Sequence, residues 1–193
     1  MLGLQLPTDP RWVKLAESNL EALLTDHAFC EQKAASNAIS LVVTYPDKTE
    51  LVKTLLPIAR EELEHFEQVH NIILQLGFSL GFEQKDVYVN ELLSFVRKGQ
   101  GREIALLDRL LFAAMIEARS CERFKMLSEK IENELLRTFY RNLMESEAGH
   151  YTTFIKLAKE YFQKEEVQER WNAFLAFEAS IMERYSRQET MHG

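Results

Sequence analysis

Two Glu-x-x-His tetrads are the residues of this chain whose types and spacing could do chemistry. Each tetrad follows a lone glutamate, at separations of 31 and 30 residues between the glutamates. In helical bundles that bind two metal ions, two helices give one Glu each and two others give a Glu and a His at i, i+3. The candidate ligands are therefore Glu31, Glu62, His65, Glu117, Glu147 and His150.

Helical phase separates these tetrads from a third one, Glu67 to His70. At about 100° per residue, seven apolar positions between Leu51 and Leu76 fall within about 40° of Glu62, which places Glu62 at the centre of a buried face. Glu67 lies about 140° away on the polar face, so it cannot reach the same site. The same test places three further glutamates at the centres of apolar faces, namely Glu31, Glu117 and Glu147.

Four buried carboxylates need a common partner, because an unpaired buried charge costs several kcal/mol or neutralises itself. One such Glu or His would ordinarily be an ion-paired or hydrogen-bonded core residue, but six in this arrangement indicate two divalent cations. Carboxylates and imidazoles suit iron or manganese better than softer metals, and we expect iron. His27 lies about 40° from Glu31. We expect it to bond to a ligand carboxylate or to pack in the core rather than to bind metal.

Caps, breaks and apolar periodicity predict the elements that position these ligands. They favour an all-α, ferritin-like four-helix bundle, with a long crossover between its second and third helices and an additional C-terminal helix. The crossover spans residues 78–101, with Gly99-Gln100-Gly101 at its end. The predicted helices are 9–44, 48–76, a short one at 84–96, 102–128, 131–162 and 165–187.

Composition predicts a single cytoplasmic domain over residues 1–193. The chain is 46% hydrophobic with only 4 Pro and 7 Gly, so it can bury a substantial core. It shows neither a basic segment followed by an apolar run at the N-terminus nor the roughly 20 consecutive apolar residues of a membrane span. Cys30 and Cys121 form no disulfide framework, and we expect both to be reduced and neither to bind metal.

Small side chains lie next to the lone glutamates, while the helices that carry the tetrads bring bulky residues to the same region. One hypothesis is that this difference leaves room for an organic substrate and O₂. The alternative is that small residues only allow close helix packing. The residues in question are Ala34, Ala35, Ala38, Ala113, Ala114 and Ser120.

The segment from Glu117 to Phe124, EARSCERF, adds a more specific signal. Together with the ligand pattern and the chain length, it resembles the tRNA hydroxylase (MiaE-like) family that acts on 2-methylthio-N6-isopentenyladenosine beside the anticodon. The resemblance covers essentially the whole chain. It implies a non-haem di-iron monooxygenase that hydroxylates the isopentenyl group with O₂ and external electrons from a separate donor protein. It also implies that the same six residues bind the two irons.

A tRNA substrate contrasts with the acidic character of the chain, whose net charge is −7 and whose pI is about 5.4. Phosphate binding normally draws on Lys and Arg, so a local basic patch is required. The alternative is that the Lys and Arg residues considered for such a patch are ordinary solvated charges. The candidates are Arg97, Lys98 and Arg102 beside the glycine loop, and Arg119, Arg123 and Lys125 on the outer side of the 102–128 helix.

Other functions use the same ligand set. A ferritin-like iron oxidation or storage protein would assemble into a shell, whereas a hydroxylase should be a monomer or small oligomer. A di-metal peroxidase or catalase would turn over peroxide. An interaction bundle with relic carboxylates would bind no metal at all.

Overall fold

The computed structural model describes residues 2–185, and all regular secondary structure in this range is α-helical. The all-α class predicted from the sequence is therefore confirmed. No helix in this range has the length and apolar character needed to cross a membrane. The helices are α1 (Trp12–Ser18), α2 (Leu20–Thr44), α3 (Thr49–Gln75), α4 (Val87–Ser94), α5 (Arg102–Lys130), α6 (Glu134–Tyr161) and α7 (Lys164–Tyr185).

The chain divides into two compact units. The α2–α3 unit is Ala16–Lys85, and the α5–α6 unit comprises the residues up to Leu15 and from Asp86 onward. The sequence-based prediction of a single domain over 1–193 stays a prediction.

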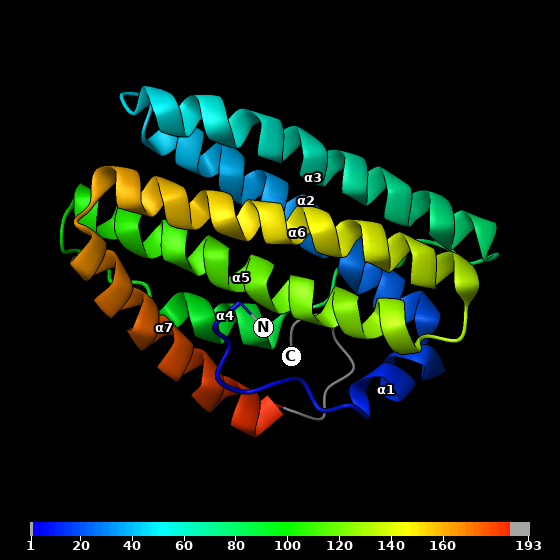
Figure 1. Cartoon of the computed structure of the whole chain (residues 1–193). Helices are drawn as coiled ribbons and strands as arrows, with labels where there is room; N and C mark the ends of the chain where they lie inside the picture. The colour runs from blue at the N-terminus through cyan, green and yellow to red at the C-terminus, as the bar shows by residue number, and fades with distance from the viewer. Residues whose placement is uncertain (1, 186–193) are drawn as a thin grey trace. The chain divides into compact units, whose positions relative to one another are not determined.

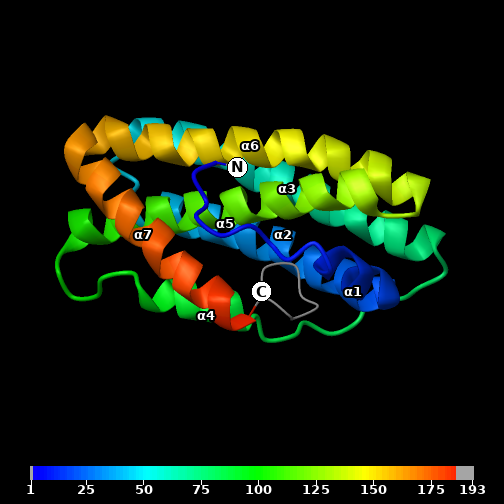
Figure 2. The same cartoon turned by 60° about the horizontal axis from the view of Figure 1, so that its bottom comes forward.

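In the α2–α3 unit, the two long helices pack side by side as an antiparallel hairpin (Figures 1 and 2). The predicted helix 9–44 is wrong in its first part, since helix begins only at Trp12 and is interrupted at Asn19. The Asn19 side chain accepts a hydrogen bond from the backbone N–H of Ala22 at 3.4 Å and so starts α2 anew. At the far end, α3 stops before Gly77 as predicted, because Gly77 has a φ of +78° that glycine tolerates best.

In the α5–α6 unit, a second antiparallel hairpin carries α7 and α4 against α5 (Figures 1 and 2). The helix predicted to start at residue 131 starts instead at Glu134, as α6. Asn133 caps it, because its side chain accepts a hydrogen bond from the backbone N–H of Leu136 at 3.2 Å. The short helix predicted at 84–96 is present as α4, capped by Asp86. The predicted end of the last helix, residue 187, lies outside the described residues.

A buried ion cluster ties α5 to α7 and to the end of the crossover. Asp108 on α5 is fully buried and accepts hydrogen bonds from two guanidinium groups. Arg97 Nη2 lies 2.8 Å from Oδ1, and Arg170 Nη2 lies 2.8 Å from Oδ2. The Arg170 guanidinium also stacks 4.2 Å from the ring centroid of Phe95. Burial raises the pKa of Asp108, but the bonds from Arg170 and Arg97 outweigh that effect and hold it below its ordinary value.

Asp108→Asn should lower the free energy of unfolding at pH 7 by about 3 kcal/mol, because it leaves two guanidinium groups without their counter-charge. Since the pKa of Asp108 is lowered by folding, its contribution is present above the unfolded-state value of about 3.9 and is lost as pH falls through the folded-state value. Urea unfolding at pH 7 and below pH 4 checks both points. The control Glu91→Gln removes an exposed pair with Arg184 and should cost less than about 1 kcal/mol. Equal losses in the two variants would contradict the assignment.

Candidate metal centre

The α2–α3 unit brings three of the predicted ligands together. Glu31 comes from α2, while Glu62 and His65 come from α3, and each offers a ligand atom within 4.8 Å of the others. We call these residues the Glu31 triad. His65 Nδ1 lies 3.3 Å from Glu62 Oε2 and 3.9 Å from Glu31 Oε2, so Nδ1 is the ring nitrogen nearest the carboxylates. All three side chains are buried, as helical phase predicted.

His27 supports this triad from one turn earlier on α2. Its Nε2 lies 2.6 Å from Glu31 Oε1, and its side chain is fully buried. His27 thus contacts the carboxylate of a candidate ligand, one of the two arrangements expected for it. Such a partner fixes the orientation of the carboxylate that it touches.

The α5–α6 unit carries a matching set, the Glu117 triad. Glu117 comes from α5, while Glu147 and His150 come from α6, and each offers a ligand atom within 4.8 Å of the others. His150 Nδ1 lies 3.8 Å from Glu147 Oε2. The exposed fractions are 4% for Glu117, 2% for Glu147 and 5% for His150. Each unit therefore holds a buried Glu/Glu/His group whose donor atoms fit a metal site.

The third tetrad and the cysteines do not join these groups. Glu67 is exposed, and the ring of His70 stacks on Phe66 with centroids 6.4 Å apart. Cys121 is buried and donates its S–H to the Met144 carbonyl at 3.3 Å. Burial, with a smaller effect of the Glu147 charge, raises the pKa of Cys121 to about 12, so the thiol stays protonated.

The segment Glu117 to Phe124 has a second role that the sequence did not reveal. Every residue in it is buried, including the two arginines that were predicted to lie on an outer basic patch. That prediction is wrong for Arg119 and Arg123, which are 0% and 1% exposed, while Lys125 is exposed. The reason is that α4, α7 and the N-terminal segment cover the face of α5 opposite Glu117.

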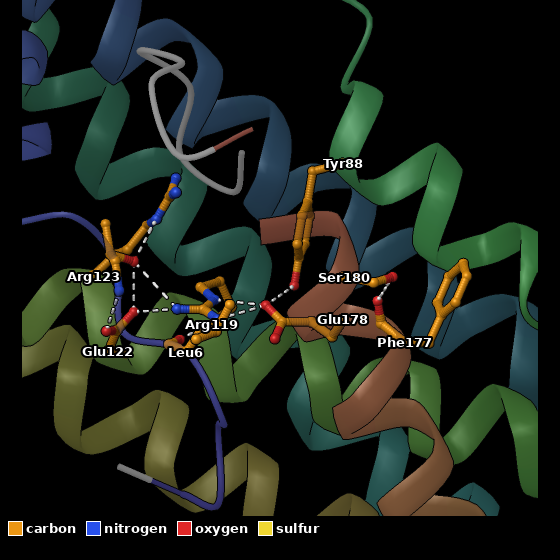
Figure 3. Close-up of polar contacts among 9 residues, drawn as sticks. Leu6, Tyr88, Arg119, Glu122, Arg123, Phe177, Glu178 and Ser180 are labelled. Carbon is orange, nitrogen blue, oxygen red and sulfur yellow. Dashed lines mark hydrogen bonds and ion pairs between the residues drawn. The ribbon is translucent and has the colours of Figure 1, made fainter. Parts of the chain in front are cut away.

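Arg119 is the centre of this covered face (Figure 3). Its Nε donates to Glu178 Oε1 on α7 at 2.9 Å, and its Nη1 donates to Glu122 Oε2 at 2.6 Å. Its Nη2 donates to the Leu6 carbonyl at 3.0 Å. The hydroxyl of Tyr88 on α4 also donates to Glu178 Oε1, at 3.2 Å. Arg119 therefore joins α7 and the N-terminal segment directly to the helix that carries Glu117, and α4 is joined to it through Glu178.

The N-terminal segment is bound to the same network through Thr8. Its backbone N–H and hydroxyl both donate to the Glu122 carboxylate, at 2.8 and 2.7 Å. Arg123 Nε donates to the Thr8 hydroxyl at 3.3 Å, and its guanidinium lies 4.6 Å from the ring centroid of Trp12. Burial, with the nearby charge of Arg119, lowers the pKa of Arg123 to about 10, so it remains a cation at neutral pH.

Comparison with known proteins decides the family. A family model described as tRNA-(MS[2]IO[6]A)-hydroxylase (MiaE) matches residues 2–193. The chain belongs to the MiaE family. The MiaE family is thus the one that the sequence resemblance indicated.

Two curated relatives agree with the MiaE assignment. The first is the tRNA 2-(methylsulfanyl)-N(6)-isopentenyladenosine(37) hydroxylase of Pseudomonas putida, 41% identical over 80% of this chain and 74% of that protein. The second has the same name and comes from Salmonella typhimurium; it is 29% identical over 98% of this chain and 87% of that protein.

A solved structure of a Synechococcus protein with aldehyde deformylating oxygenase activity is also similar to this MiaE family member. Its TM-score is 0.91 at 35% identity, covering 98% of this chain and 95% of that one. This likeness confirms the ferritin-like fold class predicted from the sequence.

Arg119→Met should lower the free energy of unfolding by about 3 to 5 kcal/mol, because it leaves Glu122 and Glu178 buried without their main counter-charge. Lys125→Met is the matched control on the same helix, since the ion pair of Lys125 with Glu129 is exposed, and it should cost less than about 1 kcal/mol. Urea unfolding of both variants measures the difference. A loss for Arg119→Met no larger than that of the control would show that the network does not stabilise α5.

Proposed function

We propose that this protein is a tRNA hydroxylase. It inserts one oxygen atom of O₂ into the isopentenyl group of 2-methylthio-N6-isopentenyladenosine beside the anticodon. The observation that carries the proposal is the match of the MiaE family model to residues 2–193, and the two buried triads support it. The reaction converts a C–H bond to C–OH and reduces the second oxygen atom to water. It consumes two electrons and two protons.

We propose that the Glu31 triad and the Glu117 triad together hold two iron ions. Four carboxylates and two imidazoles are the ligand set of di-iron sites in ferritin-like bundles, and this donor set suits iron. Bound iron would supply the electrons that activate O₂. The residues of the chain hold and orient the metal: His27 fixes Glu31 through its 2.6 Å contact, and the surrounding helices exclude water from the ligands.

For tRNA binding, we propose the basic patch beside the glycine loop. Lys98 and Arg102 are exposed. Arg97 and Arg170 both pair with the Asp108 carboxylate, so these three residues together carry one net positive charge, and Glu166 acts on Arg97 as a second, nearby negative charge. Lys98 and Arg102 would therefore make the direct phosphate contacts, with Arg97 adding to the local potential.

The remaining partners follow from the chemistry. Two external electrons per turnover imply a separate electron-donor protein, and a tRNA substrate implies the cytoplasm. A site that handles one substrate molecule needs no ferritin shell, so we propose a monomer or small oligomer.

A second candidate is aldehyde deformylation, the activity named for the Synechococcus protein at 35% identity. It would use the same two irons with a fatty aldehyde in place of the modified adenosine. The family match favours the tRNA substrate, and the two activities can be measured side by side.

The test is mass spectrometry of nucleosides from isopentenylated tRNA after incubation with Fe(II)-loaded protein, reductant and ¹⁸O₂. We expect a hydroxylated nucleoside two mass units heavier than the product made with ¹⁶O₂. A parallel reaction with a long-chain aldehyde should give no shortened product. Shortened product from the aldehyde and none from tRNA would replace the proposal with the second candidate. Mineralisation of many irons per chain would favour storage, and rapid peroxide turnover without reductant would favour a peroxidase.

Metal binding should depend on Glu62 and not on Glu67, although both glutamates lie on α3 and both begin a Glu-x-x-His tetrad. The wild-type protein should bind two Fe(II) per chain and melt at a higher temperature with Fe(II), because ligand binding to the native state stabilises it. Glu62→Ala should lose both effects, whereas Glu67→Ala should keep them. Iron analysis and thermal melts measure this, and loss of iron in Glu67→Ala would contradict the ligand assignment.

A further inference from the structure

A hollow of about 410 Å³ lies along α2 and α3. Its volume is within the roughly 300–1,000 Å³ range typical of small-molecule sites. Three large apolar side chains line it while remaining open to solvent: Ile39 is 44% exposed, Val43 72% and Leu63 54%. Single exposed apolar residues are ordinary on a protein surface. Here three of them, from two helices, surround one hollow.

The hollow adjoins the Glu31 triad within the same unit. Ala35, which is buried and lines the hollow, lies one helical turn after Glu31 on α2. Residues four apart on a helix have Cβ atoms about 5–6 Å apart. On α3, Leu63 directly follows Glu62. The hollow therefore begins about one helical turn from a proposed iron ligand.

Of the six small residues noted in the sequence, Ala35 lines this hollow. It is also buried, and it is the lining residue nearest to Glu31 in the chain. Hydroxyl groups also line the hollow, and that of Ser36 accepts from Gln32 Nε2 at 2.7 Å. The lining thus combines four apolar side chains with three hydroxyl groups, and small-molecule sites likewise add a few polar groups to an apolar lining.

We propose that this hollow receives the isopentenyl group of the modified adenosine, with Leu63 and Ile39 as the residues that select for it. The inference rests on the proposed function and adds to it the part of the protein that recognises the substrate. The isopentenyl and methylthio groups are the apolar parts of a substrate that is otherwise polar and anionic. Ala35, one helical turn from Glu31, brings the hollow close to the proposed ligands, which the carbon to be hydroxylated must reach. Phosphate contacts cannot provide this selection, because every tRNA has the same backbone.

Leu63→Gln tests the inference, and Leu74→Gln is its matched control. Both leucines lie on α3 and are about equally exposed, at 54% and 56%, but only Leu63 is among the residues found to line the hollow. The measurements are the affinity for one anticodon stem-loop with and without the isopentenyl group, KM and kcat for hydroxylation, iron content and oligomeric state.

We expect Leu63→Gln to weaken binding of the isopentenylated stem-loop about tenfold, the low end of the discrimination that small apolar groups provide. KM should rise with kcat near the wild-type value, because a contact made equally in ground and transition states is lost. Affinity for the unmodified stem-loop and iron content should not change. Leu74→Gln should match the wild type throughout.

Equal affinities of Leu63→Gln and the wild type for the isopentenylated stem-loop would overturn the inference. So would a change of oligomeric state in Leu63→Gln without a change in affinity, which would assign the hollow to contact between copies of the chain. In both cases, continued formation of the hydroxylated nucleoside would leave the proposed function intact. Absence of that product from the wild type would reject the proposed function separately.

Discussion

The cost of removing carboxylates from water governs this structure. A buried charge without a partner costs several kcal/mol, and the Glu31 and Glu117 triads together bury four glutamates. Within each unit, an imidazole and two carboxylates place donor atoms within 4.8 Å of one another. Two carboxylates this close repel each other, and a divalent cation bound between them would neutralise that repulsion. His27, at 2.6 Å from Glu31, adds a further polar contact inside an apolar environment. The interior of each hairpin is thus arranged around acidic side chains.

The same constraint explains the opposite face of α5. Arg119 and Arg123 are buried there together with Glu122 and Glu178, so the cluster holds two cations and two carboxylates. Such a network requires every member, because removing one leaves another charge buried alone. It binds the N-terminal segment, α4 and α7 to the stretch of α5 that carries Glu117. The segment from Glu117 to Phe124 therefore holds both a candidate metal ligand and the arginines that stabilise the α5–α6 unit.

Proteins with one fold can differ in function. The Synechococcus protein has aldehyde deformylating oxygenase activity, whereas the curated relatives are named as tRNA hydroxylases. Selection between an aldehyde and a modified adenosine must depend on the surfaces through which the substrate approaches. In this chain those surfaces are, on our proposals, the apolar hollow beside Ala35 and the cations Lys98 and Arg102. They separate recognition of the isopentenyl group from attraction of the phosphate backbone in a protein of net charge −7.

The sequence by itself determined the helical class, the ends of the long helices near Gly77 and Gly101, and the burial of the six candidate ligands, because these depend on local caps and on helical periodicity. It could not determine the break at Asn19, since an Asn that caps a helix and an Asn inside a helix cannot be told apart in the sequence. It also placed Arg119 and Arg123 on the surface, because they lie about 120–160° from Glu117 on the helical projection. Only the tertiary structure decided that α4, α7 and the N-terminal segment cover this face. The contacts that do so join residues far apart in the chain, 59 positions between Arg119 and Glu178 and 114 between Thr8 and Glu122.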